Sequence, residues 1–157
     1  QTSFVSYALD TNEKLERIVL IGDNGIATDT ITNVWTTLNT ETSWTELLIE
    51  DPDYACPKLN NSQLIQYNDQ LYLFGGPGQH NGKLQAFERI YASKDNGISW
   101  EAITKKVMFP QEFNTLYETA EGNYSCVVDD QQFIWIMWSQ TGEVWRGRIN
   151  KLGFERQ

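Results

Sequence analysis

The chain has 157 residues, of which 21 are acidic and 12 basic, so that its formal net charge is −9. A nucleic-acid partner is therefore not expected, because nucleic-acid binders cluster lysine and arginine on one surface. No apolar run approaches the roughly 20 residues of a membrane-spanning helix, and we expect no membrane span.

Short β-strands are predicted along the whole chain, because β-branched and aromatic residues crowd short segments bounded by turn residues. The first four strands are expected near 4–9 and 17–22, around Trp35 and at 43–47; the second four near 62–67, 70–76, 86–93 and 98–103; the third four near 125–128 and 132–138, around Trp145 and at 153–156. Each set of four predicts an antiparallel meander. We expect no helix longer than two turns in the repeats, since no segment carries apolar residues at helical spacing over a competing length.

The three sets are copies of one repeat, because each carries two aromatic residues nine positions apart. The pairs are Trp35 with Trp44, Tyr91 with Trp100, and Trp145 with Phe154. Successive copies are offset by 56 and 54 residues, a little above the roughly 40–50 residues of a four-stranded propeller blade. We expect the second aromatic of each pair to occupy an equivalent position on an outer strand, and most aromatics to pack between sheets.

Residues 93–100 resemble an Asp-box, the Ser-x-Asp-x-Gly-x-x-Trp hairpin found in sialidases and many other β-propellers. The matching residues are Ser93, Asp95, Gly97 and Trp100. Local chemistry accounts for them: the carboxylate accepts backbone N–H bonds, the glycine takes a positive φ, and the indole packs under the loop. The motif marks a fold and not an activity.

Two further resemblances also imply a propeller. The double glycine at 75–76, followed by Tyr91 and Trp100, is similar to the Kelch pattern, although the spacing between the two aromatics is longer. Residues 138–154 resemble the C-terminal end of uncharacterised exported propeller proteins of gut Bacteroidetes. This last resemblance implies an extracytoplasmic location.

The sequence therefore predicts an all-β chain, a β-propeller segment of three four-stranded antiparallel blades. The blades are expected at about 3–48, 60–104 and 123–157, within one partial propeller over residues 1–157. Three blades fall short of the typical 4–8 that close a ring. Either missing blades of a longer chain complete a six- or seven-bladed ring, or two copies associate as a homodimer.

Two long loops, at 50–57 and 104–123, are predicted on the face where propellers usually bind ligands. They carry four aromatics that we expect near one rim: Tyr54, Phe109, Phe113 and Tyr117. Exposed aromatics beside carboxylates and amides would stack on sugar rings or hold a peptide. The alternative is that they cover the junction between blades.

A glycine-rich loop holds the second set of candidates, Gln79, His80 and Asn81, which offer hydrogen-bond donors and acceptors to ligand hydroxyls. The alternative is an ordinary hairpin tip. His80 is the only histidine and has no cysteine near it in sequence, so we expect no metal site and no cofactor. Cys56 and Cys126 lie in different repeats, where they form either a disulfide or, more commonly for an inner strand, small buried side chains.

The function that these features favour is non-catalytic: a propeller that binds a glycan or protein ligand, or a scaffold that contacts only neighbouring domains. The alternative is part of a propeller glycoside hydrolase of the sialidase type, which the Asp-box resemblance raises. Sialidase-like sites hold a substrate carboxylate with three arginines. Here the five arginines lie on second and third strands and at the C-terminal end, whereas a central site needs residues from inner strands.

Overall fold

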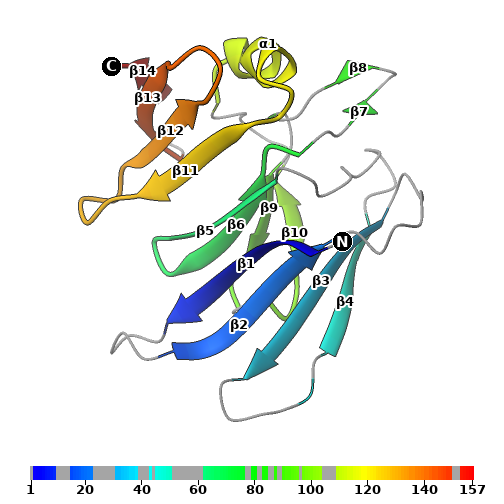
Figure 1. The fold of residues 1–157 in the computed structure, drawn as a ribbon. Coiled ribbons are helices and arrows are strands. Elements are labelled where there is room, and N and C mark those ends of the chain that lie inside the picture. Colours follow the sequence, from blue (N-terminus) through cyan, green and yellow to red (C-terminus); the bar gives the residue numbers. More distant parts are fainter. Residues whose placement is uncertain are drawn as a thin grey trace.

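The computed structural model of the chain describes backbone and side chains for Ser43 and residues 62–76, 87, 90–95, 97–103, 109–149 and 153–157. It describes the backbone alone for residues 2–9, 15–22, 31–38, 45–50, 79–80 and 83–84. These residues form antiparallel β-sheets and one short helix (Figure 1). That helix is neither long nor apolar enough to cross a membrane.

Three four-stranded sheets make up the fold. The first contains β1 (Thr2–Leu9), β2 (Leu15–Gly22), β3 (Ile31–Leu38) and β4 (Thr45–Glu50). The second contains β5 (Gln63–Tyr67), β6 (Gln70–Phe74), β9 (Ile90–Ser93) and β10 (Glu101–Ile103). The third contains β11 (Tyr124–Val128), β12 (Ile134–Trp138), β13 (Val144–Arg148) and β14 (Gly153–Arg156). In each sheet the strands follow chain order and pair antiparallel, as the sequence predicts.

Two elements interrupt this regular order. A small hairpin of β7 (Gln79–His80) and β8 (Lys83–Leu84) is inserted between β6 and β9 of the second sheet. The helix α1 (Glu112–Thr119) stands between the second and third sheets in sequence.

The register of the outer hairpins confirms that the three sheets are equivalent. In each, the first aromatic of the pair lies opposite a residue eleven positions further along: Trp35 opposite Glu46, Tyr91 opposite Ala102, and Trp145 opposite Arg156. Because side chains alternate along a strand, a shared register gives each sheet the same assignment of positions to its two faces. Positions in one sheet can therefore be compared with those in another.

The turn between β5 and β6 shows how local residues set this register. Asn68 and Asp69 have φ values of 47° and 59°, the left-handed conformation that both central residues of a tight type I′ hairpin turn require. Asn and Asp tolerate this conformation better than most residues. The predicted strand, turn and strand at this place are confirmed.

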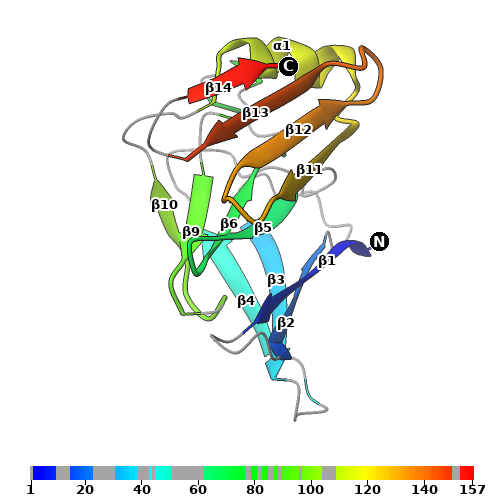
Figure 2. The same ribbon diagram turned by 90° about the vertical axis from the view of Figure 1, so that its left-hand side faces the viewer.

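The three sheets are arranged in a fan, with the second sheet between the other two (Figures 1 and 2). The first strand of the second sheet, β5, contacts the first strand of each neighbour, β1 on one side and β11 on the other. First strands thus meet along the inside of the fan, while later strands diverge.

An aromatic core fills the space between the second and third sheets. Phe87 lies at its centre and is 1% exposed. Six aromatic rings have centroids 5.1–6.3 Å from that of Phe87: Phe74, Phe109, Phe113, Tyr117, Tyr124 and Trp138. All six are in edge-to-face or tilted arrangements with Phe87, which the ring quadrupole favours. The predicted role of most aromatics, packing between sheets, is borne out for these rings.

The helix α1 lies between the second and third repeats, in the segment that the sequence predicts as a long loop. Its apolar residues Phe113, Leu116 and Tyr117, followed by Ala120, recur at the spacing of one helix face, and that face packs on the aromatic core. The helix ends in a pair of backbone bonds from Gly122 N to Tyr117 O (2.8 Å) and from Glu121 N to Glu118 O (3.1 Å), the Schellman pattern.

Candidate functional site

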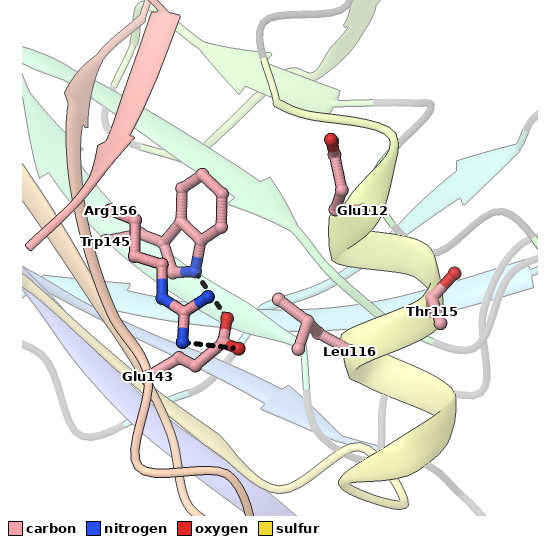
Figure 3. A pocket seen from close by; sticks show the side chains of 6 residues that line it. All are labelled: Glu112, Thr115, Leu116, Glu143, Trp145 and Arg156. Carbon is pink, nitrogen blue, oxygen red and sulfur yellow. Dashed lines mark hydrogen bonds and ion pairs between the residues drawn. The ribbon is translucent and has the colours of Figure 1, made fainter.

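A groove lies between α1 and the outer strands of the third sheet, with a volume of about 410 Å³ (Figure 3). Three lining residues come from the helix and three from the sheet and its preceding turn: Glu112, Thr115, Leu116, Glu143, Trp145 and Arg156. The lining brings charged, hydroxyl and aromatic groups together around one hollow.

The sheet wall of the groove is built by strand register. Trp145 on β13 lies directly opposite Arg156 on β14, so their side chains share one face of the sheet. Glu143, which immediately precedes β13, receives a hydrogen bond from Trp145 Nε1 to Oε2 at 3.1 Å and pairs with Arg156 Nη2 through Oε1 at 3.1 Å. The Glu143 side chain is 18% exposed and that of Arg156 is 63% exposed, so the pair leaves the guanidinium open to solvent.

The helix wall is held in place by Phe113, which is fully buried and points from α1 into the core. Its ring meets that of Trp145 edge to face, with centroids 5.3 Å apart and planes at 85°. Leu116 points across the groove toward Glu143, while Glu112 and Thr115 stand at the edge (Figure 3). The same helix thus contributes both the packing that fixes Trp145 and the polar rim.

The chemistry of the groove suits recognition. An indole ring beside hydroxyl, carboxylate and guanidinium groups can contact an apolar ligand surface and hydrogen-bond to its polar edge. Glu143 is held by two donors and partly buried, which makes it a fixed acceptor. Glu112 and Arg156 remain exposed at opposite walls and are free to contact a ligand.

The turn at 93–100 has the local chemistry that the sequence predicts. Asp95 accepts hydrogen bonds from Ser93 Oγ (2.8 Å) and from the backbone N–H of Ser99 (2.8 Å), and Gly97 has a φ of 87°. Partial burial acts to raise the pKa of Asp95, but the bonds from Ser99 and Ser93 outweigh it and hold that pKa below its ordinary value. Trp100 is half-buried and donates from Nε1 to the Gly97 carbonyl at 3.1 Å. These bonds fix the turn internally.

Three predicted ligand-binding aromatics belong to the core. Phe109, Phe113 and Tyr117 are 4%, 0% and 5% exposed, so they offer no ring face to a ligand. They are buried because α1 turns the apolar side of residues 109–120 toward Phe87. The alternative reading, in which these rings cover the junction between two sheets, describes what the structure contains.

The other predicted ligand-binding residues are placed only in part. Gln79 and His80 form β7, of which the backbone alone is described. Tyr54 and Asn81 lie outside the described residues. The hairpin of β7 and β8 agrees with the alternative of an ordinary hairpin tip, and a ligand-binding role for these side chains stays a prediction.

The described side chains hold no group of three or more His, Cys, Asp or Glu placed to bind a metal ion. The three described arginine side chains do not converge either. Arg156 lines the groove, whereas Arg146 and Arg148 lie over the ring of Phe133, with their Cζ atoms 4.0 and 3.8 Å from its centroid.

Sequence reasoning missed the groove because it needs the helix as one wall. The available signal was the recurrence of Phe113, Leu116, Tyr117 and Ala120 at helical spacing. The sequence predicts a packing role for Trp145, and its contact with the Phe113 ring is a packing contact. Glu143 and Arg156 belong to no recognisable sequence motif.

The search against curated proteins finds no match for this chain. Residues 1–157, the whole sequence, match the family model of the DUF6242 beta propeller domain. This match agrees with the antiparallel four-stranded sheets, their shared register and the meeting of first strands inside the fan. The chain belongs to the DUF6242 beta propeller domain family.

Proposed function

We propose that this propeller domain is a non-catalytic binding module and that the groove beside α1 recognises a glycan. The observation that supports it is the lining of the groove: the indole of Trp145, with Glu143 and Arg156 fixed beside it and Glu112 on the opposite wall. Aromatic rings stack on the apolar faces of sugars, while carboxylates and guanidinium groups bind their hydroxyls. The proposed location is extracytoplasmic, in keeping with the resemblance to exported propellers.

The sialidase-type alternative draws no support from the described residues. A carboxylate-binding trio would need three guanidinium groups around one position, and Arg146 and Arg148 alternate onto the sheet face opposite that of Arg156. A fold shared with propeller hydrolases does not transfer their activity.

A glycan-array screen of the purified chain, followed by titration calorimetry with any hit, tests the proposal. Replacing Glu112 by alanine removes a polar group from the groove and should weaken binding by about tenfold, equivalent to roughly 1.4 kcal/mol. Glu118→Ala is the matched control, because Glu118 is also exposed on α1 but does not line the groove. We expect its affinity to equal that of the wild type.

Arg156→Ala provides a second test from the sheet wall and should weaken the same ligand. The proposal fails if no glycan binds, or if Glu112→Ala and Glu118→Ala have equal effects. Thermal unfolding of each variant separates lost binding from lost structure.

A further inference from the structure

The face of the third sheet that points away from the second sheet is apolar and open. We call it the outer face, and its side chains are those of Ser125, Val127, Phe133, Trp135, Met137, Val144, Arg146, Arg148 and Glu155. Alternation along β12 places Ile134, Ile136 and Trp138 in the core, each 0% exposed. Trp135 and Met137 therefore lie on the opposite side.

The second sheet has an equivalent face that is covered, and the two faces can be compared residue by residue. Register makes the two sheets comparable across their strands: Leu64, Leu73 and Tyr91 lie side by side in the second, as do Cys126, Ile136 and Trp145 in the third. One position further along each strand, the side chains point to the opposite face.

At those next positions the two sheets differ sharply in exposure. Ile65 and Phe74 in the second sheet are 6% and 2% exposed, since they pack in the core against the third sheet. Their equivalents in the third sheet, Val127 and Met137, are 61% and 50% exposed. The outer face of the third sheet is therefore equivalent to the face of the second sheet that the third sheet covers.

The outer face also carries charged groups. Arg146 and Arg148 lie over Phe133, and Arg148 donates from Nη2 to the Gln131 carbonyl at 2.9 Å and from Nε to the Gln132 carbonyl at 3.3 Å. Glu155 lies opposite Arg146 on the same face, and Asp129 at its edge accepts a hydrogen bond from Trp135 Nε1 at 2.7 Å, so the outer face combines an apolar surface with charged groups of both signs. The chain as a whole has a net charge of −9.

We propose that the outer face binds the β1–β4 sheet of a second copy of this chain, so that two chains close a ring of six four-stranded sheets. The first sheet has the same register as the third, since Trp35 lies opposite Glu46 as Trp145 lies opposite Arg156. The first sheet can therefore pack on an outer face in the way that the third sheet packs on the second. Its strands contain three glutamates and one arginine, so they offer carboxylates to Arg146 and Arg148 and a guanidinium group to Glu155.

A two-fold axis lets both copies use the same contact. The outer face of each chain meets the first sheet of the other, and six sheets lie within the 4–8 blades of closed propellers. An exposed apolar face of this kind is seldom left in water. This proposal is independent of the groove, which lies on the other side of the third sheet.

Light scattering coupled to gel filtration tests the proposal on the intact chain. At tens of micromolar the wild type should run at twice the 18.1 kDa of one chain. The double variant Val127→Lys/Met137→Lys should be a folded monomer, because two buried charges would oppose the contact. Ile98→Lys is the matched control, since Ile98 is 51% exposed but lies in the 93–100 turn; it should remain a dimer.

Hydrogen exchange identifies which surface the outer face meets. Above the dissociation concentration, amides of β1–β4 and of β12–β13 should gain protection together, and the lysine variant should lose both gains. A wild-type monomer, a double variant that still dimerises, or a dimer with unchanged exchange in β1–β4 would each overturn the proposal. Near-ultraviolet circular dichroism of the variants confirms that their packing is native.

Discussion

The surroundings of Gly75 leave no room for a side chain. Its φ is +72°, and a Cβ built there would lie 1.9 Å from Tyr124 Oη and 3.0 Å from Phe87 Cζ. The Tyr124 hydroxyl occupies that space because it donates to the carbonyls of Gly75 (3.0 Å) and Phe74 (3.3 Å). A residue of the third sheet is thereby bonded to the end of a strand in the second.

Replacing Gly75 by alanine should lower the free energy of unfolding by about 3–5 kcal/mol, through left-handed strain, overpacking and loss of the Tyr124 bond. Gly142→Ala is the matched control: its φ is +69°, but nothing lies within 4 Å of the added carbon. Strain alone should cost it about 1 kcal/mol. Urea unfolding of both variants measures the difference, and equal losses would show that the contact with Tyr124 does not matter.

At the scale of elements, α1 combines favourable packing with an unfavourable end. Glu121, at the position after the helix cap, has a φ of 51°, a conformation that glycine adopts without cost. The last turn of the helix contains no basic residue, and Glu118 and Glu121 add negative charge where the helix dipole is already negative.

Glu121→Gly should therefore stabilise the protein, by about 0.5–1 kcal/mol, since it removes both the backbone strain and a charge. Glu121→Ala removes the charge alone and keeps the strain, so it should gain little. Urea midpoints of the two variants decide the point. If alanine stabilises as much as glycine, the charge and not the backbone is responsible.

The elements also show what sequence reasoning could and could not reach. Strand positions followed from alternation and turn residues, so that β14 begins and ends where expected and β5 differs by one residue at its start. The helix was missed because Phe109, Phe113 and Tyr117 were interpreted as loop aromatics. Only three-dimensional packing shows that these rings contact Phe87 in the core. The groove depends on the same packing, because it places α1 beside the third sheet.

On the scale of the whole molecule, the order of the sheets follows from the repeat, whereas the contacts between sheets do not. Shared register fixes which residues of a sheet face a neighbour, but the bond from Tyr124 to Gly75 joins residues 49 positions apart and has no counterpart in any local motif. The described residues leave the outer face of the third sheet uncovered, with Val127 and Met137 exposed on it. The family match shows a propeller, while the number of blades remains part of the proposal.

Cys126 lies in the seam between the second and third sheets, two residues after Tyr124 on β11, and packs against the core. Burial raises the pKa of its thiol to about 12. Since the thiolate is the reactive form, Cys126 should react with alkylating reagents more slowly than an ordinary cysteine.

The rate at which this thiol is labelled should therefore report on separation of the two sheets. In a Cys56→Ser background, iodoacetamide should label Cys126 more slowly in the native protein than in urea, because the seam partly shields the thiol and keeps it protonated. Adding Gly75→Ala, which breaks the bond that closes the seam, should quicken labelling, whereas Gly142→Ala should change it far less. Native labelling as fast as in urea would contradict this, and a measured slow rate would time how often a propeller parts between two of its sheets.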